Sequence, residues 1–294
     1  LSYAGNLSNL IDIQNEHNYN FLKGDIRDRD FINFVFKKYK FDNVINLAAE
    51  SHVDRSIKSP EEFVETNVLG TFNLLNSFKN TWFKNFENKL FYQVSTDEVY
   101  GSIENQDFSN EETRYDPRSP YSASKASSDH FVKAFGNTYK MPYIISYSSN
   151  NYGEYQFPEK IIPLTINNII NNKEIPIYGD GTQVRDWLYV LDHVQAIDSI
   201  FHSSKKNNVY NIGGMNQISN VDLVSKICSI IDARLNKKEG SSLSLIRFVE
   251  DRPGHDKRYA LDISKINNQL GWKPKFSLDE GLRITIDWYL SNNE

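Results

Sequence analysis

Short apolar runs alternate with amphipathic stretches along the first half of the chain. We predict strands at 41–49, 90–95 and 142–147, the first running into a loop, and helices at 62–79 and 121–140. In the second of these helices, Phe131 and Phe135 lie one turn apart on one face. Strands and helices that alternate in this way form βαβ units, so the pattern predicts a doubly wound parallel α/β sheet.

Helix and strand patterns are mixed in the second half of the chain. We predict helices at 161–172, 189–204, 220–234 and 278–290, and extended segments at 175–178 and 209–212. The last two helices look like surface elements of a second, smaller unit. We therefore expect two interleaved domains, the larger over 1–149 and 187–213 and the smaller over 150–186 and 214–294. Doubly wound sheets bind ligands at the carboxyl ends of their strands, so motifs just after a strand carry the most weight.

Composition narrows the classes of protein that fit. Of the 294 residues, 39% are hydrophobic and 24% are charged, a globular balance that excludes a disordered chain. The net charge of -5 gives no electrostatic reason to expect nucleic acid or an anionic membrane as a partner. No apolar run approaches the ~20 residues of a membrane-spanning helix. Cys228 is the single cysteine, which excludes an internal disulfide and makes a reducing cytoplasm the expected location.

Tyr121 and Lys125 are one helical turn apart in the helix predicted at 121–140, so their side chains share one face. A free phenol, with a pKa near ~10, is a poor base at neutral pH, but a nearby ammonium group favours the phenolate. The pair therefore fits a base for a sugar hydroxyl. The same spacing also arises by chance at the start of ordinary amphipathic helices, so the pair alone does not decide the function.

Three polar side chains, Thr96, Asp97 and Glu98, follow the strand predicted at 90–95. Two carboxyl groups in different environments take opposite protonation states, which gives one acid and one base. A helix N-cap explains one polar residue at this place, but not three in a row before Val-Tyr-Gly. We interpret the segment as part of an active site.

The segment 251–256 combines an arginine, a Pro-Gly turn and a histidine, which suits a clamp for a diphosphate. Arg185 is a second candidate for the same anion. A solvated turn explains the segment equally well on its own. The small residues after the first predicted strand would let a cofactor approach the backbone, with Glu50 and Ser51 within reach of a ligand. No histidine has a His or Cys neighbour at ligand spacing, so we expect no metal site.

Taken together, these motifs resemble the nucleoside-diphosphate-sugar 4,6-dehydratases of the extended short-chain dehydrogenase/reductase family, from one end of the chain to the other. The resemblance is carried by YAGN at 3–6, LAAESHVDRS at 47–56, STDEVYG at 95–101, SPYSASKASSDH at 119–130, NNYGEYQFPEKIIP at 150–163, RDWLYV at 185–190, YNIGG at 210–214 and DRPGHD at 251–256. It implies that the larger domain is a Rossmann-type NAD-binding domain and the smaller one a nucleotide-sugar-binding domain.

The family chemistry gives these residues roles. The resemblance implies that NAD takes a hydride from C4 of the glucose ring of dTDP-glucose while Tyr121, helped by Lys125 and Thr96, removes the 4-hydroxyl proton. Glu98 would remove the C5 proton, and Asp97 would protonate the departing C6 hydroxyl. The hydride would return to C6, giving a 4-keto-6-deoxy sugar for deoxysugar biosynthesis, such as that of dTDP-rhamnose. The thymidine base rests on the resemblance alone.

The resemblance also implies binding contacts and an assembly. For NAD, the residues are Asp25, Ile26, Leu47, Ala48, Ala49, Glu50, Thr66, Tyr121, Lys125 and Asn151. For the nucleotide sugar, they are Ser51, Thr96, Asn150, Lys160, Ile161, Pro176, Ile177, Tyr178, Arg185, Asn220, Asp251, Arg252, Pro253, Gly254 and His255. A homodimer is expected, with the helices at 62–79 and 121–140 in its interface.

The start of the chain departs from the family pattern. The glycine-rich G-x-x-G-x-x-G turn, which brings a pyrophosphate to a helix N-terminus, is absent, and so is the acidic residue after the second strand. We expect a missing segment of about 30 residues that holds one strand, the loop, a helix and a second strand. A protein that truly began at Leu1 would be expected to misfold or to be an inactive binding form.

Two alternatives stay open. A UDP-sugar 4,6-dehydratase, a 4-epimerase or a UDP-glucuronate decarboxylase would share the fold. The epimerase and the decarboxylase need Tyr121 and Lys125 but no acid and base for dehydration, so Asp97 and Glu98 favour a dehydratase. A non-catalytic protein that binds NAD or a nucleotide sugar would be expected to have lost these groups, yet all of them are present.

Overall fold

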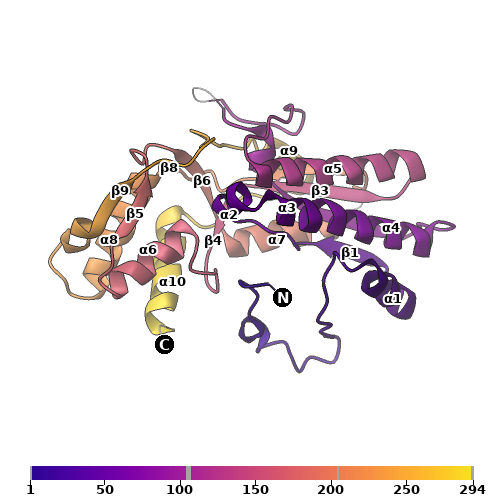
Figure 1. Cartoon of the computed structure of the whole chain (residues 1–294), viewed down its shortest axis with the longest axis horizontal. Coiled ribbons are helices and arrows are strands. Elements are labelled where there is room, and N and C mark those ends of the chain that lie inside the picture. Colours follow the sequence, from indigo (N-terminus) through magenta and orange to yellow (C-terminus); the bar gives the residue numbers. More distant parts are fainter. Residues whose placement is uncertain (1, 104–106, 204, 293–294) are drawn as a thin grey trace.

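A four-stranded parallel sheet forms the centre of the molecule (Figure 1). The computed structural model describes residues 2–103, 107–203 and 205–292. The strands, in spatial order, are β1 (Asn43–Asn46), β2 (Leu90–Thr96), β3 (Tyr143–Ser148) and β7 (Asn208–Ile212). All three neighbouring pairs are parallel, which confirms the α/β sheet predicted from the alternating sequence pattern.

Helices cover both faces of this sheet. One face carries α1 (Arg29–Tyr39), α4 (Thr71–Trp82) and α5 (Pro120–Tyr139), and the other carries α7 (Val190–Phe201) and α9 (Ser264–Leu270). Successive side chains of a strand point to opposite faces. In β2, Phe91 therefore packs among α1, α4 and α5, while Leu90 and Tyr92 pack against α7 and α9. Burial on both faces is the arrangement that parallel sheets require.

A second core lies beside the sheet, around α6, α8 and α10 (Figure 1). Its elements are β4 (Asn150–Tyr152), α6 (Ile161–Ile170), β5 (Ile175–Tyr178), β6 (Val184–Tyr189), β8 (Gln217–Ser219), α8 (Asn220–Arg234), β9 (Ile246–Val249) and α10 (Leu278–Ser291). The strands pair as β4-β6-β8 and β5-β9. Ile166, Ile227 and Ile286, one from each helix, are fully buried in one cluster. The residue boundaries of the two expected domains stay a prediction.

The helix predicted at 62–79 consists of three parts. It begins as α3 (Pro60–Phe63), widens into a π-helical segment η2 (Val64–Gly70) and continues as α4. Asn67 lies in the π-helical segment, where its side chain accepts a hydrogen bond from the Glu50 amide (2.9 Å) and donates to the Glu50 carbonyl (2.9 Å) and the Ser124 hydroxyl (2.8 Å). The wider turn thus ties the loop after β1 to α5, as π-segments at functional sites often do.

The remaining predicted helices and strands are confirmed to within a few residues, although residue 204 of the helix predicted at 189–204 lies outside the described residues. α5 begins at Pro120 behind a capping box, in which Ser119 Oγ accepts from the Ser122 amide at 3.0 Å. Sequence reasoning missed α1, α2 (Val53–Lys58), α9 and the short strands β4, β6, β8 and β9. No helix in the described ranges is long and apolar enough to cross a membrane.

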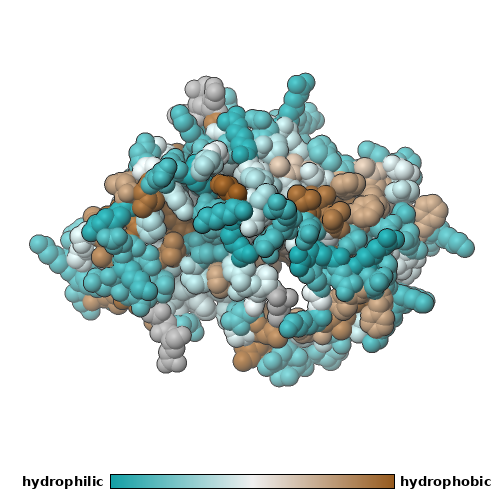
Figure 2. All heavy atoms as spheres, in the orientation of Figure 1, coloured by the Kyte–Doolittle hydropathy of each residue, from teal (hydrophilic) through white to brown (hydrophobic). Residues whose placement is uncertain are grey.

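The segment that precedes α1 adds few side chains to either core. Figure 2 shows hydrophobic side chains at the surface over this segment, at the lower edge of the view. The short helix η1 (Leu7–Leu10) buries no residue, and Ile11 is 59% exposed. The segment therefore follows the surface rather than filling the interior.

We predict that Gly214→Ala destabilises the protein because Gly214 passes directly over the backbone of β6. A Cβ at this position would lie 1.9 Å from the Trp187 carbonyl oxygen, which cannot swing away as a side chain does. The expected loss is roughly 3 kcal/mol, at the upper end of overpacking costs. Gly271→Ala is the matched control: its φ of +67° costs about 1 kcal/mol, and nothing lies within 4 Å. Equal losses by chemical denaturation would contradict the prediction.

Candidate active site

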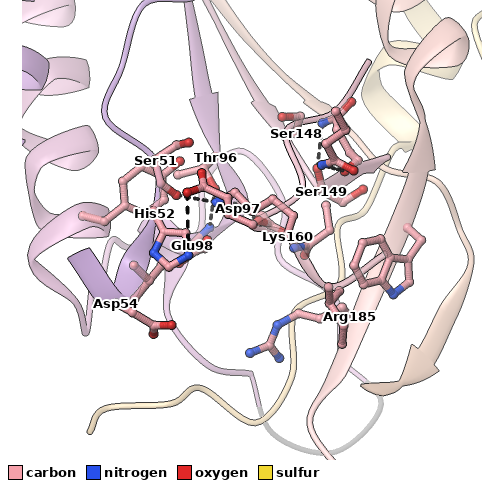
Figure 3. Close-up of a pocket in the computed structure, with 18 of the residues that line it drawn as sticks. Ser51, His52, Asp54, Thr96, Asp97, Glu98, Ser148, Ser149, Lys160 and Arg185 are labelled. Atoms are coloured by element: carbon pink, nitrogen blue, oxygen red, sulfur yellow. Dashed lines mark hydrogen bonds and ion pairs between the residues drawn. The ribbon is translucent and has the colours of Figure 1, made fainter. Parts of the chain in front are cut away.

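A cavity of about 720 Å³ lies at the carboxyl ends of β2 and β3. Its walls come from the loop after β1, the end of β2, α5, the end of β3 and the second core (Figure 3). In the close-up, Thr96, Asp97 and Glu98 lie between Ser51, His52 and Asp54 on one side and Lys160 and Arg185 on the other. This is the edge at which parallel α/β sheets bind ligands.

All five expected catalytic residues, Thr96, Asp97, Glu98, Tyr121 and Lys125, line this cavity. The short helix η3 (Asp97–Tyr100) begins directly after β2, and the Thr96 hydroxyl caps it by accepting from the Glu98 amide at 3.3 Å. Thr96 therefore caps a helix and also lines the cavity, so the N-cap considered in the sequence analysis is present as well.

Asp97 is placed to hold a proton. Its side chain is 3% exposed, Thr96 Oγ1 donates to its Oδ1 at 3.3 Å, and its Oδ2 has no hydrogen-bond partner among the described residues. Burial, and then the charges of Glu98 and Asp186, raise the pKa of Asp97 well above its ordinary value. A carboxyl group with a raised pKa is suited to act as a general acid near neutral pH.

Glu98 is the next residue, but the charged side chains around it differ from those around Asp97. Burial raises its pKa overall, although the charges of Arg252, Arg185 and Lys160 lower it. For Asp97, Arg185 is the cation among the main influences, and the pKa is raised well above its ordinary value. Both carboxyl groups therefore have raised pKa values, but three cations favour the carboxylate form of Glu98.

Tyr121 and Lys125 share one face of α5, as the spacing predicted, and both are buried. Burial, and then the charge of Glu98, raise the pKa of Tyr121, while a hydrogen bond with Thr96 lowers it. Lys125 Nζ donates to the Val94 carbonyl at 2.8 Å, and burial lowers the pKa of this lysine. The pKa of Tyr121 is therefore not lowered as its spacing from Lys125 led us to expect, because burial and the charge of Glu98 outweigh the effect of Thr96.

Cationic side chains from the second core face the carboxyl groups. Lys160 Nζ donates to the Ser51 carbonyl at 2.7 Å, and Arg252 pairs with Asp54 at 3.5 Å. Arg185 is held more tightly, because its guanidinium donates to the Val184 and Asp256 carbonyls at 2.8 and 2.9 Å. Arg252 and Lys160 therefore keep more freedom than Arg185 to turn toward an anion.

Most of the expected binding residues reach the cavity. Besides the five catalytic candidates, these are Leu47, Ala49, Ser51, Asn150, Asn151, Lys160, Ile161, Pro176, Ile177, Tyr178, Arg185, Asn220, Arg252 and His255. Eight others are not in its wall: Asp25, Ile26, Ala48, Glu50, Thr66, Asp251, Pro253 and Gly254. Asp25 instead pairs with Arg27 at 2.7 Å, and Asp251 Oδ1 accepts from His255 Nδ1 at 2.7 Å. The individual roles of all these residues stay predictions.

The structure adds residues that sequence reasoning missed. Asp54 lines the cavity and accepts from the Tyr178 hydroxyl at 2.8 Å. Glu159 and His193 also line it, and Asn67 fixes the loop after β1 from behind. Asp54 and Glu159 lie within segments that carry the resemblance, so those segments were the available signal. Nothing in the local spacing marks Asn67 or His193.

The cavity wall fits a nicotinamide dinucleotide. Asn150 Oδ1, Asn151 Oδ1 and Gln156 Oε1 are buried acceptors without a partner among the described residues, and His193 Nε2 is likewise unpartnered. A carboxamide and ribose hydroxyls are the kind of groups that would satisfy them. Among the described residues, no group of three or more His, Cys, Asp or Glu side chains is arranged to hold a metal ion.

Comparisons with known proteins agree with this geometry. Residues 1–285 match the protein family described as GDP-mannose 4,6 dehydratase. The chain is 49% identical over 296 residues to a probable dTDP-glucose 4,6-dehydratase of Sinorhizobium fredii, covering 99% of this chain and 84% of that protein. It is 48% identical over 308 residues to a dTDP-glucose 4,6-dehydratase of Escherichia coli, with the same coverage.

Solved structures give the same result. The crystal structure of DesIV, a dTDP-glucose 4,6-dehydratase from Streptomyces venezuelae with NAD and TYD bound, is similar with a TM-score of 0.91 and 39% identity, covering 100% of this chain and 86% of that one. A UDP-glucose 4-epimerase from Thermotoga maritima is similar with a TM-score of 0.85, but at 27% identity, covering 100% of this chain and 90% of that one.

The parallel sheet, the Tyr121–Lys125 pair and the adjacent carboxyl groups define a Rossmann-type, NAD-dependent enzyme of the short-chain dehydrogenase/reductase class. Within this class, the chain belongs to the dTDP-glucose 4,6-dehydratase family of hydro-lyases. The resemblance inferred from the sequence motifs is confirmed.

Proposed function

We propose that this protein removes water from dTDP-glucose to give dTDP-4-keto-6-deoxyglucose. The observation that carries the proposal is the placement of Asp97 and Glu98 side by side in a cavity that Tyr121 also lines. A 4-epimerase or a UDP-glucuronate decarboxylase needs the tyrosine but no acid and base for dehydration. The alternative of a binding protein without catalysis leaves this set of groups unexplained.

The oxidation would take place next to α5. When bound, NAD would supply the reversible hydride acceptor that the reaction needs. Leu47, Ala49 and Asn151, together with Tyr121 and Lys125, would hold it in the cavity. Tyr121 would remove the proton of the sugar 4-hydroxyl, and Lys125 would favour the phenolate form of Tyr121.

The elimination would use the two carboxyl groups. A ketone at C4 makes the C5 proton acidic, and Glu98, whose carboxylate form is favoured by Arg252, Arg185 and Lys160, would remove it. Asp97, kept protonated by burial and by the charge of Glu98, would give its proton to the departing C6 hydroxyl. Glu98 would then return a proton to C5 as C6 is reduced.

The proton balance gives Thr96 a further task in this scheme. In each turnover Tyr121 gains the 4-hydroxyl proton, while Asp97 loses a proton to the water that leaves. The site is reset only when a proton passes from Tyr121 to Asp97. The Thr96 hydroxyl donates to Asp97 Oδ1 at 3.3 Å and lies near enough to Tyr121 to lower its pKa, so it would carry the proton between them.

The nucleotide part of the substrate would lie against the second core. Arg252 and Lys160 would bind the diphosphate, with Arg185 and His255 adding to the positive field. The remaining wall residues, Asn150, Ile161, Pro176, Ile177, Tyr178 and Asn220, would enclose the sugar and the base.

The assembly and the location belong to the same proposal. The helices expected at a homodimer interface, 62–79 and 121–140, expose apolar side chains at Val64, Leu69 and Phe131. Such residues are typical of a face that a second copy would cover. The division into an NAD-binding and a nucleotide-sugar-binding domain, and the cytoplasmic location, stay predictions.

Product analysis in heavy water tests the proposed function directly. We expect the full-length protein with NAD to convert dTDP-glucose, but not UDP-glucose, into a product that has lost water and gained one solvent deuterium at C5. Mass spectrometry measures both changes. Epimer formation without a mass change, or loss of carbon dioxide, would assign the protein to a sister activity.

Tyr121→Phe should abolish the oxidation step, because it removes the group assigned to take the 4-hydroxyl proton. The expected loss in rate is about 10²–10⁴-fold, the usual contribution of a positioned base. Tyr92→Phe is the matched control, since the Tyr92 hydroxyl is buried on the other face of the sheet without a partner among the described residues. Reduced cofactor forming at the normal rate in Tyr121→Phe would contradict the assigned role.

Glu98→Gln should still permit oxidation at C4 but should block loss of water. We expect product formation to fall by about 10²–10⁴-fold, together with deuterium exchange at C5. Glu154→Gln, which changes a carboxylate bonded to Tyr189 outside the cavity wall, is the control and should keep full activity. Normal turnover in Glu98→Gln would remove this residue from the mechanism.

A further inference from the structure

Four ionisable side chains form one stripe along α5. Tyr121, Lys125, Asp129 and Lys133 follow each other at intervals of one helical turn. Side chains at this spacing are neighbours on a helix surface. The first two line the cavity of the proposed active site, whereas Asp129 is not in its wall. The scheme described above gives Asp129 no task.

Asp129 is fully buried. Ser95 Oγ donates to its Oδ2 at 2.6 Å, and the Tyr115 hydroxyl donates to the same oxygen at 3.5 Å. Its Oδ1 has no hydrogen-bond partner among the described residues. An incompletely bonded carboxylate in the interior is costly, so a feature of this kind calls for a reason beyond packing.

Lys125 is a buried cation with few hydrogen-bond partners, just as Asp129 is a buried anion. It is 4% exposed, and the Val94 carbonyl is its one hydrogen-bond acceptor in the described part of the chain. Burial lowers the pKa of Lys125, and the charge of Asp129 is what raises it again. A negative charge one turn further along the helix therefore favours the ammonium form of Lys125.

We propose that Asp129 is a positioning residue of the dehydration reaction: its buried carboxylate is the counter-charge that keeps Lys125 an ammonium ion behind Tyr121. This inference rests on the proposed function for the role of Tyr121. In this role Asp129 would affect the reaction through Lys125, without itself contacting substrate or cofactor.

The surroundings of Asp129 allow it to carry this charge. Burial raises the pKa of Asp129 to about 6, while Lys125, Ser95, Lys133 and Tyr115 each lower it. The carboxylate form therefore dominates above about pH 6, where the counter-charge is needed.

The other titratable groups near Asp129 come from several elements. Lys133 on α5 donates to the Tyr115 hydroxyl at 3.2 Å, and Tyr147 on β3 contacts the same hydroxyl at 2.5 Å. Tyr100 on η3 packs against Tyr147 with the two rings tilted, and the exposed ring of His130 lies 5.1 Å from that of Tyr115. The phenols stay neutral because burial raises their pKa values. Lys125 and Lys133 are thus the cations that face this carboxylate.

The decisive measurement is the titration of Lys125 itself, followed by NMR of lysine labelled with ¹³C at Cε, with the resonance assigned from Lys125→Arg. In Asp129→Asn we expect the pKa of Lys125 to fall by about one to two units, as removal of a unit charge at neighbouring helix positions predicts. An unchanged Lys125 titration in the folded variant would overturn the proposal.

Two further variants keep the test decisive. Asp232→Asn removes another buried carboxylate, bonded to Ser241 and Ser242 in the second core, and should leave the Lys125 titration unchanged. If Asp129→Asn does not fold, Asp129→Ser removes the same charge with a smaller side chain and should lower the pKa of Lys125 by a similar amount. No shift in the folded Asp129→Ser variant would also count against the proposal.

The pH profile of single-turnover oxidation is the second readout. We expect the rate to fall at high pH as Lys125 loses its proton, so Asp129→Asn should move this fall to lower pH by the same one to two units. If the role of Asp129 were purely structural, the variant would be slower at every pH and the fall at high pH would stay at the same pH. That result would overturn the inference. If the Lys125 titration shifts but dTDP-glucose gives no dehydrated product, the charge pair stands and the proposed function fails.

Discussion

Burial of ionisable groups at the carboxyl end of β2 is the constraint on which the site depends. Asp97, Tyr121 and Lys125 are each less than a tenth exposed, so water does little to fix their charges. In such a place the neighbouring charges decide which form each group takes. The reaction needs one carboxylic acid, one carboxylate, one phenol able to lose its proton and one ammonium. The fold therefore has to supply a specific set of neighbours for each.

The scaffold meets this need with rigid connections rather than with long loops. Thr96 ends β2 and caps η3, which sets the directions of Asp97 and Glu98. The capping box at Ser119 fixes the start of α5, and therefore the position of Tyr121 in its first turn. Asn67 joins that helix to the loop after β1. Each of these devices fixes a functional side chain through backbone hydrogen bonds, which is the condition for pre-organised chemistry.

Local motifs made much of this predictable from the sequence, because the spacing of Tyr121 and Lys125 and the run at Thr96 lie within single elements. Contacts between distant segments were not predictable. Asn67, Asp54 and the Ser95–Asp129 bond depend on how separate elements meet, and no local pattern marks them. The shift of the Tyr121 pKa was also out of reach, since spacing gives the neighbour on the helix but not the depth of burial. The assignment of Asp25 to the cofactor rested on resemblance, and its side chain is bonded to Arg27.

The division of labour between the two cores explains why two adjacent carboxyl groups can behave differently. The central sheet carries Asp97 and Glu98, which share one strand end. The cations that lower the pKa of Glu98 all come from the second core: Lys160 precedes α6, Arg185 lies on β6, and Arg252 follows β9. Among the main influences on Asp97, one cation, Arg185, stands against two carboxyl groups, Glu98 and Asp186. A sheet alone would leave both carboxyls in nearly equal surroundings. The acid and the base are therefore distinguished by packing the second core against the sheet, so the substrate-binding unit is also part of the catalytic machinery.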